Sequence, residues 1–275
     1  MEILNGFPLP ERLIEIFVRG SDPATARFPQ TEIFNEGWML RLVLDAFKQL
    51  EISEGPFGFL PKADWHSEAR LASPFRPRQK RDPLGEGFTH ADGVVGHFVV
   101  REETRVGLQL ATSTQQFVVV EAKMLSNLSS GVSNARGYDQ AARNVACISQ
   151  AISLVFSDAN AIQDIGFYVL APTREFRPTR TNLESCMRAD SIRTKVRERV
   201  QAYADFGRKE AAQLSAWFNA HFEPLLSRLD AEGKLRVVTW DECIDAIGGV
   251  DARCADELRA FYDRCLELAS VNSKQ

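Results

Sequence analysis

The sequence lacks the features that would place the protein in a membrane or outside the cell. It has no hydrophobic run approaching the ~20 residues that a membrane-spanning helix requires. Its opening, MEILNGFPLPERL, has neither the basic nor the apolar segment of a signal peptide. The five cysteines are scattered without a CxxC pair, which argues against a disulfide framework and a thiolate zinc site. We therefore expect a soluble, reduced, cytoplasmic protein with no membrane partner.

A large net charge and the common nucleotide-binding and hydrolase motifs are also missing. The formal net charge is −4, from 33 basic and 37 acidic residues, so a histone-like polycation is excluded and any contact with nucleic acid must come from a local basic patch. The chain has no G-x-x-x-x-G-K-[ST] loop, no G-x-S-x-G elbow and no H-E-x-x-H pair. These absences argue against a P-loop nucleotide hydrolase, an α/β-hydrolase and a zinc protease.

The hydrophobic pattern that is present predicts an α/β (α+β) protein with a mixed central sheet flanked by helices. The expected helices span 31–50, 135–157, 181–231 and 251–270, and the expected strands span 90–100, 105–111, 115–124, 164–172 and 234–240. Residues 51–89 contain five prolines and are expected to be irregular. Because no repeat or linker divides the chain, we expect one domain over 1–275. Its core covers about 31–172 and 234–247, with a helical insertion at about 181–231.

The most unusual local pattern is Glu121-Ala122-Lys123, directly after the apolar run Phe-Val-Val-Val. Residues two apart on a strand point to the same face, so Glu121 and Lys123 share one side of the sheet. Ionised groups beside a buried strand cost several kcal/mol unless they are paired, hydrated or bound to metal. The pattern is therefore either a salt-bridged strand end or part of a functional site.

Asp92, at the start of an earlier expected strand, favours the functional site. A second carboxylate beside Glu121 makes an oxygen-rich pocket for a hard cation such as Mg²⁺ or Mn²⁺. Lys123, on the same face, would orient an attacking water or neutralise a phosphate as a compact positive charge. The pattern therefore indicates metal-assisted phosphodiester hydrolysis.

Asp92 followed by Glu121-x-Lys123 at the end of a valine-rich strand resembles the PD-(D/E)XK nuclease superfamily, and the expected order of elements is similar to that of its core. The resemblance implies a restriction-endonuclease-like fold, here with a C-terminal helical elaboration, and a metal-dependent nuclease with DNA as the expected substrate. Asp92, Glu121 and the carbonyl of Ala122 would hold Mg²⁺ or Mn²⁺, and Lys123 would position the attacking water. Two positions depart from the family pattern: Ala91 replaces a proline, and Asn144 replaces a tyrosine.

The resemblance adds residues from two helices. Glu36, with Glu32 as the fallback, would complete the metal site, although an acid in the first turn of a helix is also favoured by the helix dipole. Gln140 would hydrogen-bond near the site and Arg143 would meet a phosphate. Both are equally compatible with an ordinary amphipathic helix.

A basic loop provides candidates for nucleic-acid binding. Arg76, Arg78, Lys80 and Arg81 cluster between prolines, where they would clamp a phosphate backbone or simply be solvated. The alternative function is a catalytically inactive module of the same fold that binds nucleic acid or a protein. The sequence leaves open the choice between DNA and RNA, and the oligomeric state, a homodimer included.

Overall fold

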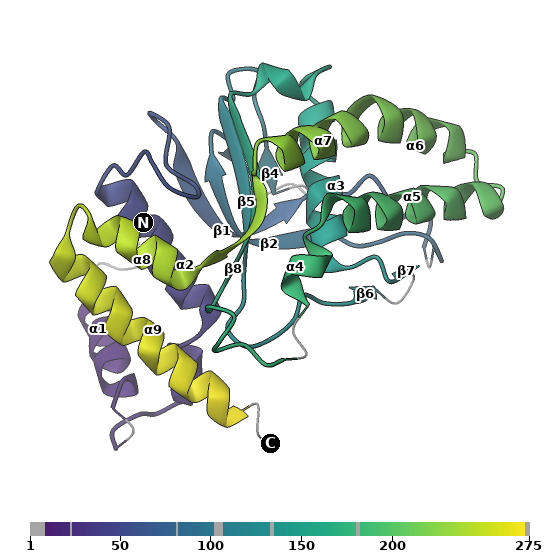
Figure 1. Ribbon diagram of the computed structural model, residues 1–275. Coiled ribbons are helices and arrows are strands. Elements are labelled where there is room, and N and C mark those ends of the chain that lie inside the picture. Colours follow the sequence, from purple (N-terminus) through teal and green to yellow (C-terminus); the bar gives the residue numbers. More distant parts are fainter. Residues whose placement is uncertain are drawn as a thin grey trace.

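The computed structural model describes residues 9–22, 24–80, 82–101, 107–132, 135–179 and 182–272. A five-stranded mixed sheet runs through the middle of the protein, with helices on both faces (Figure 1). The strand order is β1-β2-β5-β8-β9. The predicted α/β class, with a mixed central sheet flanked by helices, is confirmed.

The sheet combines an antiparallel half with a parallel half. Strands β1 (Asp64–Leu71), β2 (Thr89–Gly96) and β5 (Gln116–Ala122) pair in antiparallel fashion, and β8 (Asp164–Ala171) and β9 (Leu235–Thr239) continue the sheet parallel to β5. Every residue of the central strand β5 is buried. This agrees with its run of apolar residues without alternation, which is typical of a strand covered on both faces.

Two helical layers enclose the sheet (Figure 1). On one side lie α2 (Glu36–Gln49), α8 (Trp240–Gly248) and α9 (Ala252–Asn272), and on the other α3 (Gln140–Ser153), α5 (Ala189–Asp205), α6 (Ala211–Trp217) and α7 (Glu223–Ala231). The side chains of β5 alternate between the two layers. Val118 and Val120 join the core beneath α2, whereas Phe117 and Val119 join the core beneath α3.

The second layer includes the helical segment that connects β8 with β9. Helix α4 (Leu183–Cys186) begins it, and a π-helical turn (Phe218–Phe222) joins α6 to α7. Helix α1 (Leu9–Gly20) lies near the N-terminus. The remaining elements are short: two 3₁₀ turns, Gln30–Glu32 and Ala159–Ala161, and two hairpins, β3 (Val99–Val100) with β4 (Leu108–Gln109) and β6 (Gly131–Val132) with β7 (Ala135–Arg136). None of the helices in the described residues has both the length and the apolar character needed to cross a bilayer.

The main error of the sequence prediction concerns the first strand. Residues 64–71 were expected to be irregular, yet they form β1 at one edge of the sheet. Its sequence, DWHSEARL, is mostly polar and charged and shows no regular hydrophobic alternation. In addition, Glu68 lies in the left-handed region (φ 55°), which is unusual within a strand. Its neighbouring prolines, Pro61 and Pro74, lie outside it.

Further boundaries differ from the prediction. Within residues 107–111, the described part of the strand expected at 105–111, only the two residues of β4 form a strand, and they pair with β3 outside the main sheet. Residues 105 and 106 lie outside the described residues. The helix expected from 135 begins only at Gln140, because Asp139 caps it by accepting a hydrogen bond from the backbone N–H of Ala142. Asn35 caps α2 in the same way, so the helix expected over 31–50 begins at Glu36.

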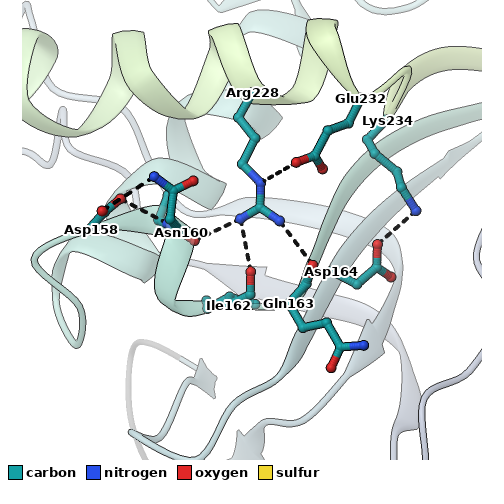
Figure 2. Close-up of polar contacts among 9 residues, drawn as sticks. Asp158, Asn160, Ile162, Gln163, Asp164, Arg228, Glu232 and Lys234 are labelled. Atoms are coloured by element: carbon teal, nitrogen blue, oxygen red, sulfur yellow. Dashed lines mark hydrogen bonds and ion pairs between the residues drawn. The ribbon is translucent and has the colours of Figure 1, made fainter.

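Arg228 fastens helix α7 to the segment that leads into β8 (Figure 2). Its guanidinium donates hydrogen bonds to the carbonyl oxygens of Ala159, Ile162 and Gln163, at 2.9 to 3.0 Å, and also pairs with Glu232. The side chain is only 14% exposed. A planar guanidinium with five donors is suited to such a set of acceptors.

We expect Arg228→Ala to lower the free energy of unfolding by about 1.5–3 kcal/mol, because three backbone carbonyls, two of them partly buried, would lose a charged donor. The matched control is Arg236→Ala, which removes an exposed ion pair with Glu242 and should cost less than about 1 kcal/mol. Chemical denaturation of the two variants measures both values. Equal losses would show that the carbonyl contacts of Arg228 contribute nothing.

Candidate active site

The acidic residues meet where β2 and β5 stop pairing. The antiparallel register ends at Gly93 opposite Val120, so Asp92 and Glu121 are the next pair along the two strands. Beyond this point the backbone N–H of Ala122 donates its hydrogen bond to a side chain of β2 and not to its backbone. The acceptor is Asp92 Oδ2, at 2.8 Å. The two carboxylates are thereby held at one end of the sheet by the strands that carry them.

Glu121 is fully buried and surrounded by donors. Its Oε1 accepts hydrogen bonds from Lys123 Nζ, at 2.7 Å, and from Gln140 Nε2. Its Oε2 accepts one from Asn144 Nδ2 at 3.2 Å. The side-chain amides of Gln140 and Asn144, on helix α3, thus orient the Glu121 carboxylate. Lys123 contacts the same carboxylate from the end of the strand that carries Glu121.

The charges at this site oppose one another. Burial raises the pKa of Glu121 to about 8, and repulsion by Asp92 and a hydrogen bond with it act in the same direction, whereas Lys123 lowers the pKa. Burial alone would lower the pKa of Lys123, but the charges of Glu121, Asp92 and Glu36 together raise it above its ordinary value. Lys123 is therefore a firmly charged ammonium beside two acids.

The backbone of Lys123 is fixed from both sides. Its N–H donates to the carbonyl of Leu170 on β8 at 2.8 Å, and its carbonyl accepts from the indole N–H of Trp240 at 3.1 Å. Trp240 is itself completely buried at the start of α8. A side chain that leaves such a fixed backbone, and is only 12% exposed, has little freedom to turn away from Glu121.

The donor set suits a hard divalent cation held with the help of other ligands. Asp92 and Glu121 provide two carboxylates, and Mg²⁺ is commonly bound by one or two carboxylates together with water and substrate phosphate oxygens. In the described part of the chain, no group of three or more histidine, cysteine, aspartate or glutamate side chains is arranged to hold a metal. The residues therefore fit a site that a substrate completes, and not an all-protein cage.

Glu36 lies in the first turn of α2, partly exposed, near the same end of the sheet. Its charge reaches Lys123, where it contributes to the raised pKa. It joins neither Asp92 nor Glu121 in a metal-binding group of the described residues. Its role as a third metal ligand remains a prediction.

Helix α3 contributes one residue that the sequence prediction included and one that it missed. Gln140, which was included, contacts Glu121 directly. Asn144 was treated only as a departure from the family pattern, yet it is fully buried and donates to the other oxygen of Glu121. The signal was present in the sequence, because positions 140 and 144 are one helical turn apart and share a face.

Arg143 points into the protein and not towards Glu121. Its Nε lies 3.9 Å from Glu86 Oε2, and its terminal nitrogen lies 3.4 Å from the hydroxyl of Thr89. Glu86 is buried, and burial raises the pKa of this carboxyl group although Ser73 and two arginines lower it. Contact of Arg143 with a phosphate therefore remains a prediction that requires this pair to open.

The basic loop is not next to the acids. Arg76 and Arg78 line a cavity together with Gln150 and Ser153, near the end of α3 opposite to Gln140. Lys80 is exposed, and Arg81 lies outside the described residues. Their predicted contact with nucleic acid stays a prediction, at a place distinct from Glu121.

Comparison with known proteins gives no independent identification: no protein-family model, curated protein or solved structure matches the chain. Function is therefore inferred from the geometry of the residues themselves.

Proposed function

We propose that the protein is a metal-dependent nuclease that hydrolyses phosphodiester bonds, with DNA as the expected substrate. One observation carries the proposal: Asp92 and the buried Glu121 converge where β2 leaves β5, and Lys123 contacts Glu121 on the same face. If Glu121 and Lys123 formed only a structural ion pair, Asp92 would not be required beside them. The charge of Asp92 raises the pKa of Glu121 and so opposes its ionisation.

Each residue has a chemical role in this proposal. Asp92 and Glu121 would hold Mg²⁺ or Mn²⁺. A bound cation of this kind lowers the pKa of water and offsets negative charge on the scissile phosphate. Lys123 would position the attacking water, while Gln140 and Asn144 keep the Glu121 carboxylate in one orientation through their amide donors.

The arrangement of the sheet supports a restriction-endonuclease-like fold as part of the same proposal. A helix, three antiparallel strands, a second helix and a parallel strand surround the acids in chain order, and the acidic pair lies on neighbouring strands of this unit. Fold alone does not choose a reaction, so the proposal depends on the side chains at the strand ends.

The proposal is tested with supercoiled plasmid incubated with Mg²⁺ or Mn²⁺. Wild-type protein should nick the DNA, and Lys123→Ala should reduce the rate by about 10²-fold, as expected for loss of a group that orients the nucleophile. The matched control is Lys234→Ala, which removes another lysine–carboxylate pair, with Asp164 at 2.8 Å, at the opposite end of the sheet.

The control variant should nick at the wild-type rate. Thermal unfolding of all three proteins checks that each is folded. Equal rates in wild type and Lys123→Ala would refute the assignment, because any cleavage would then come from another site.

A second candidate function is an inactive module of this fold that binds nucleic acid or a protein. The observation in its favour is that Lys123 pairs directly with Glu121, and the described residues offer two carboxylates and no third ligand at that point. Calorimetric titration with Mn²⁺ distinguishes the two functions. Saturable binding that Asp92→Asn abolishes supports the nuclease, whereas no binding supports the module.

A further inference from the structure

A cavity of about 520 Å³ lies far from Glu121, on the α3 side of the sheet. It is enclosed by the loop after β1, the end of α3, and the junction of α6 with the π-helical turn. Its volume falls within the range of small-molecule sites in proteins. π-helical turns interrupt α-helices at a cost and frequently mark functional sites.

The cavity is basic on one side and has no acidic lining residue. Arg76, Arg78 and His221 line it, and the lining includes neither aspartate nor glutamate. Among the described residues, the side chains of these three make no hydrogen bond or ion pair that would satisfy them. Arg76 is half-buried and Arg78 is exposed. Most other buried or half-buried arginines in the described residues have a carboxylate or carbonyl partner, as Arg228 and Arg208 illustrate.

The other side of the cavity combines apolar surface with a donor that lacks a partner. Leu154, Leu214 and Trp217 provide the apolar surface. Trp217 is 8% exposed, and its indole Nε1 is buried without a hydrogen-bond partner in the described residues. This N–H is therefore a donor that is not already engaged by another described residue.

We propose that this cavity binds a phosphate-bearing ligand of nucleotide size, with its phosphate at Arg76 and Arg78 and its less polar part against the exposed side chain of Leu154. Guanidinium groups bind phosphate through paired charge-assisted hydrogen bonds, and apolar side chains in a pocket contact the rest of a ligand. The ligand is either a free nucleotide or the terminal nucleotide of a polynucleotide strand, because both present the same chemistry.

This site is distinct from the proposed nuclease site. Gln140 contacts Glu121, whereas Gln150 and Ser153 line the cavity. These positions on α3 are separated by about 15–20 Å, from the 1.5 Å rise per residue of an α-helix. Binding here therefore does not depend on the metal site or on cleavage.

The test is calorimetry without divalent cations, so that failure of the nuclease proposal cannot affect the result. The probes are a nucleoside 5′-monophosphate, inorganic phosphate, and a short single-stranded oligonucleotide with and without a 5′-phosphate. We expect saturable binding of at least one phosphate-bearing probe. Arg76→Ala and Arg78→Ala should each weaken it about tenfold or more.

The charge-matched control is Arg253→Ala, on the exposed face of α9, which should bind like wild type. Tighter binding of the 5′-phosphorylated oligonucleotide than of the monophosphate identifies a strand end as the ligand. Tighter binding of the monophosphate identifies a free nucleotide. The proposal is overturned if no probe binds saturably, or if binding is unchanged in Arg76→Ala and Arg78→Ala while thermal unfolding shows that both are folded.

Discussion

Replacing Glu121 by glutamine is expected to raise the melting temperature of the metal-free protein and to abolish its proposed Mg²⁺-dependent cleavage of DNA. The carboxyl group is fully buried beside Asp92, and these two features outweigh the opposing charge of Lys123 and raise the pKa of Glu121 to about 8. An acid whose pKa is raised in the folded protein lowers stability at pH values above its ordinary pKa. A neutral amide of the same shape removes this penalty, and we expect a gain of about 1–3 kcal/mol in the free energy of unfolding at neutral pH.

The hydrogen bonds around position 121 can adapt to the amide. Lys123 and Gln140 donate to one oxygen, which the amide retains. The new NH₂ group would face Asn144, whose Oδ1 is buried without a hydrogen-bond partner in the described residues. A flip of the Asn144 amide would present that oxygen as the acceptor.

The rate of DNA cleavage by Glu121→Gln should fall, although its stability should rise. An amide is a much weaker metal ligand than a carboxylate, so the nicking rate should fall by about 10²-fold or more. The control Glu242→Gln removes an exposed carboxylate that pairs with Arg236 and should change stability by less than about 1 kcal/mol without loss of nicking. Calorimetry and the plasmid assay measure the two effects. A stability loss in Glu121→Gln would contradict the first expectation, and retained nicking would contradict the second.

Trp240→Ala should produce the largest loss of stability. The side chain is completely buried between the sheet and α9, where it packs against Tyr262 with ring centroids 6.4 Å apart. Truncation of a buried tryptophan leaves a large cavity and typically costs about 3–5 kcal/mol. Denaturation by urea measures the change in the free energy of unfolding.

Two further variants separate packing from hydrogen bonding at Trp240. Trp240→Phe keeps an aromatic ring but removes the indole N–H that donates to the carbonyl of Lys123, so it should cost about 1–3 kcal/mol. Trp65→Ala, on the edge strand β1 and only partly buried, serves as the control and should lose less than Trp240→Ala. If Trp240→Ala and Trp65→Ala lose the same free energy of unfolding, the stability of the core beneath α8 does not depend on Trp240.

The sequence was sufficient for those features that short-range patterns determine. The apolar run of β5 predicted a buried strand, and the apolar periodicity of 31–50 predicted the helix α2, whose start lies five residues later than expected. The two-residue period of a strand placed Glu121 and Lys123 on one face, and they are in contact. These predictions need only the local geometry of the backbone.

The features that the sequence did not predict depend on contacts between distant segments. Strand β1 is stabilised by pairing with β2 and carries little hydrophobic signal of its own. The inward orientation of Arg143 depends on Glu86, 57 positions earlier in the chain, and the burial of Asn144 depends on Glu121. No local pattern specifies such partners, because Arg143 and Asn144 have the sequence context of ordinary polar residues on an amphipathic helix.

The left-handed residue in β1 also affects what happens at the border of the sheet. Sheet borders present rows of backbone donors and acceptors that can recruit strands from other molecules and lead to aggregation. Ser67 and Ala69 pair with β2, but Glu68, between them, leaves the extended conformation and interrupts the row. With charged side chains at Asp64 and Arg70 as well, β1 is a poor template for an incoming strand. The departure of Glu68 from the extended conformation thus makes the addition of a strand from another molecule at this border less favourable.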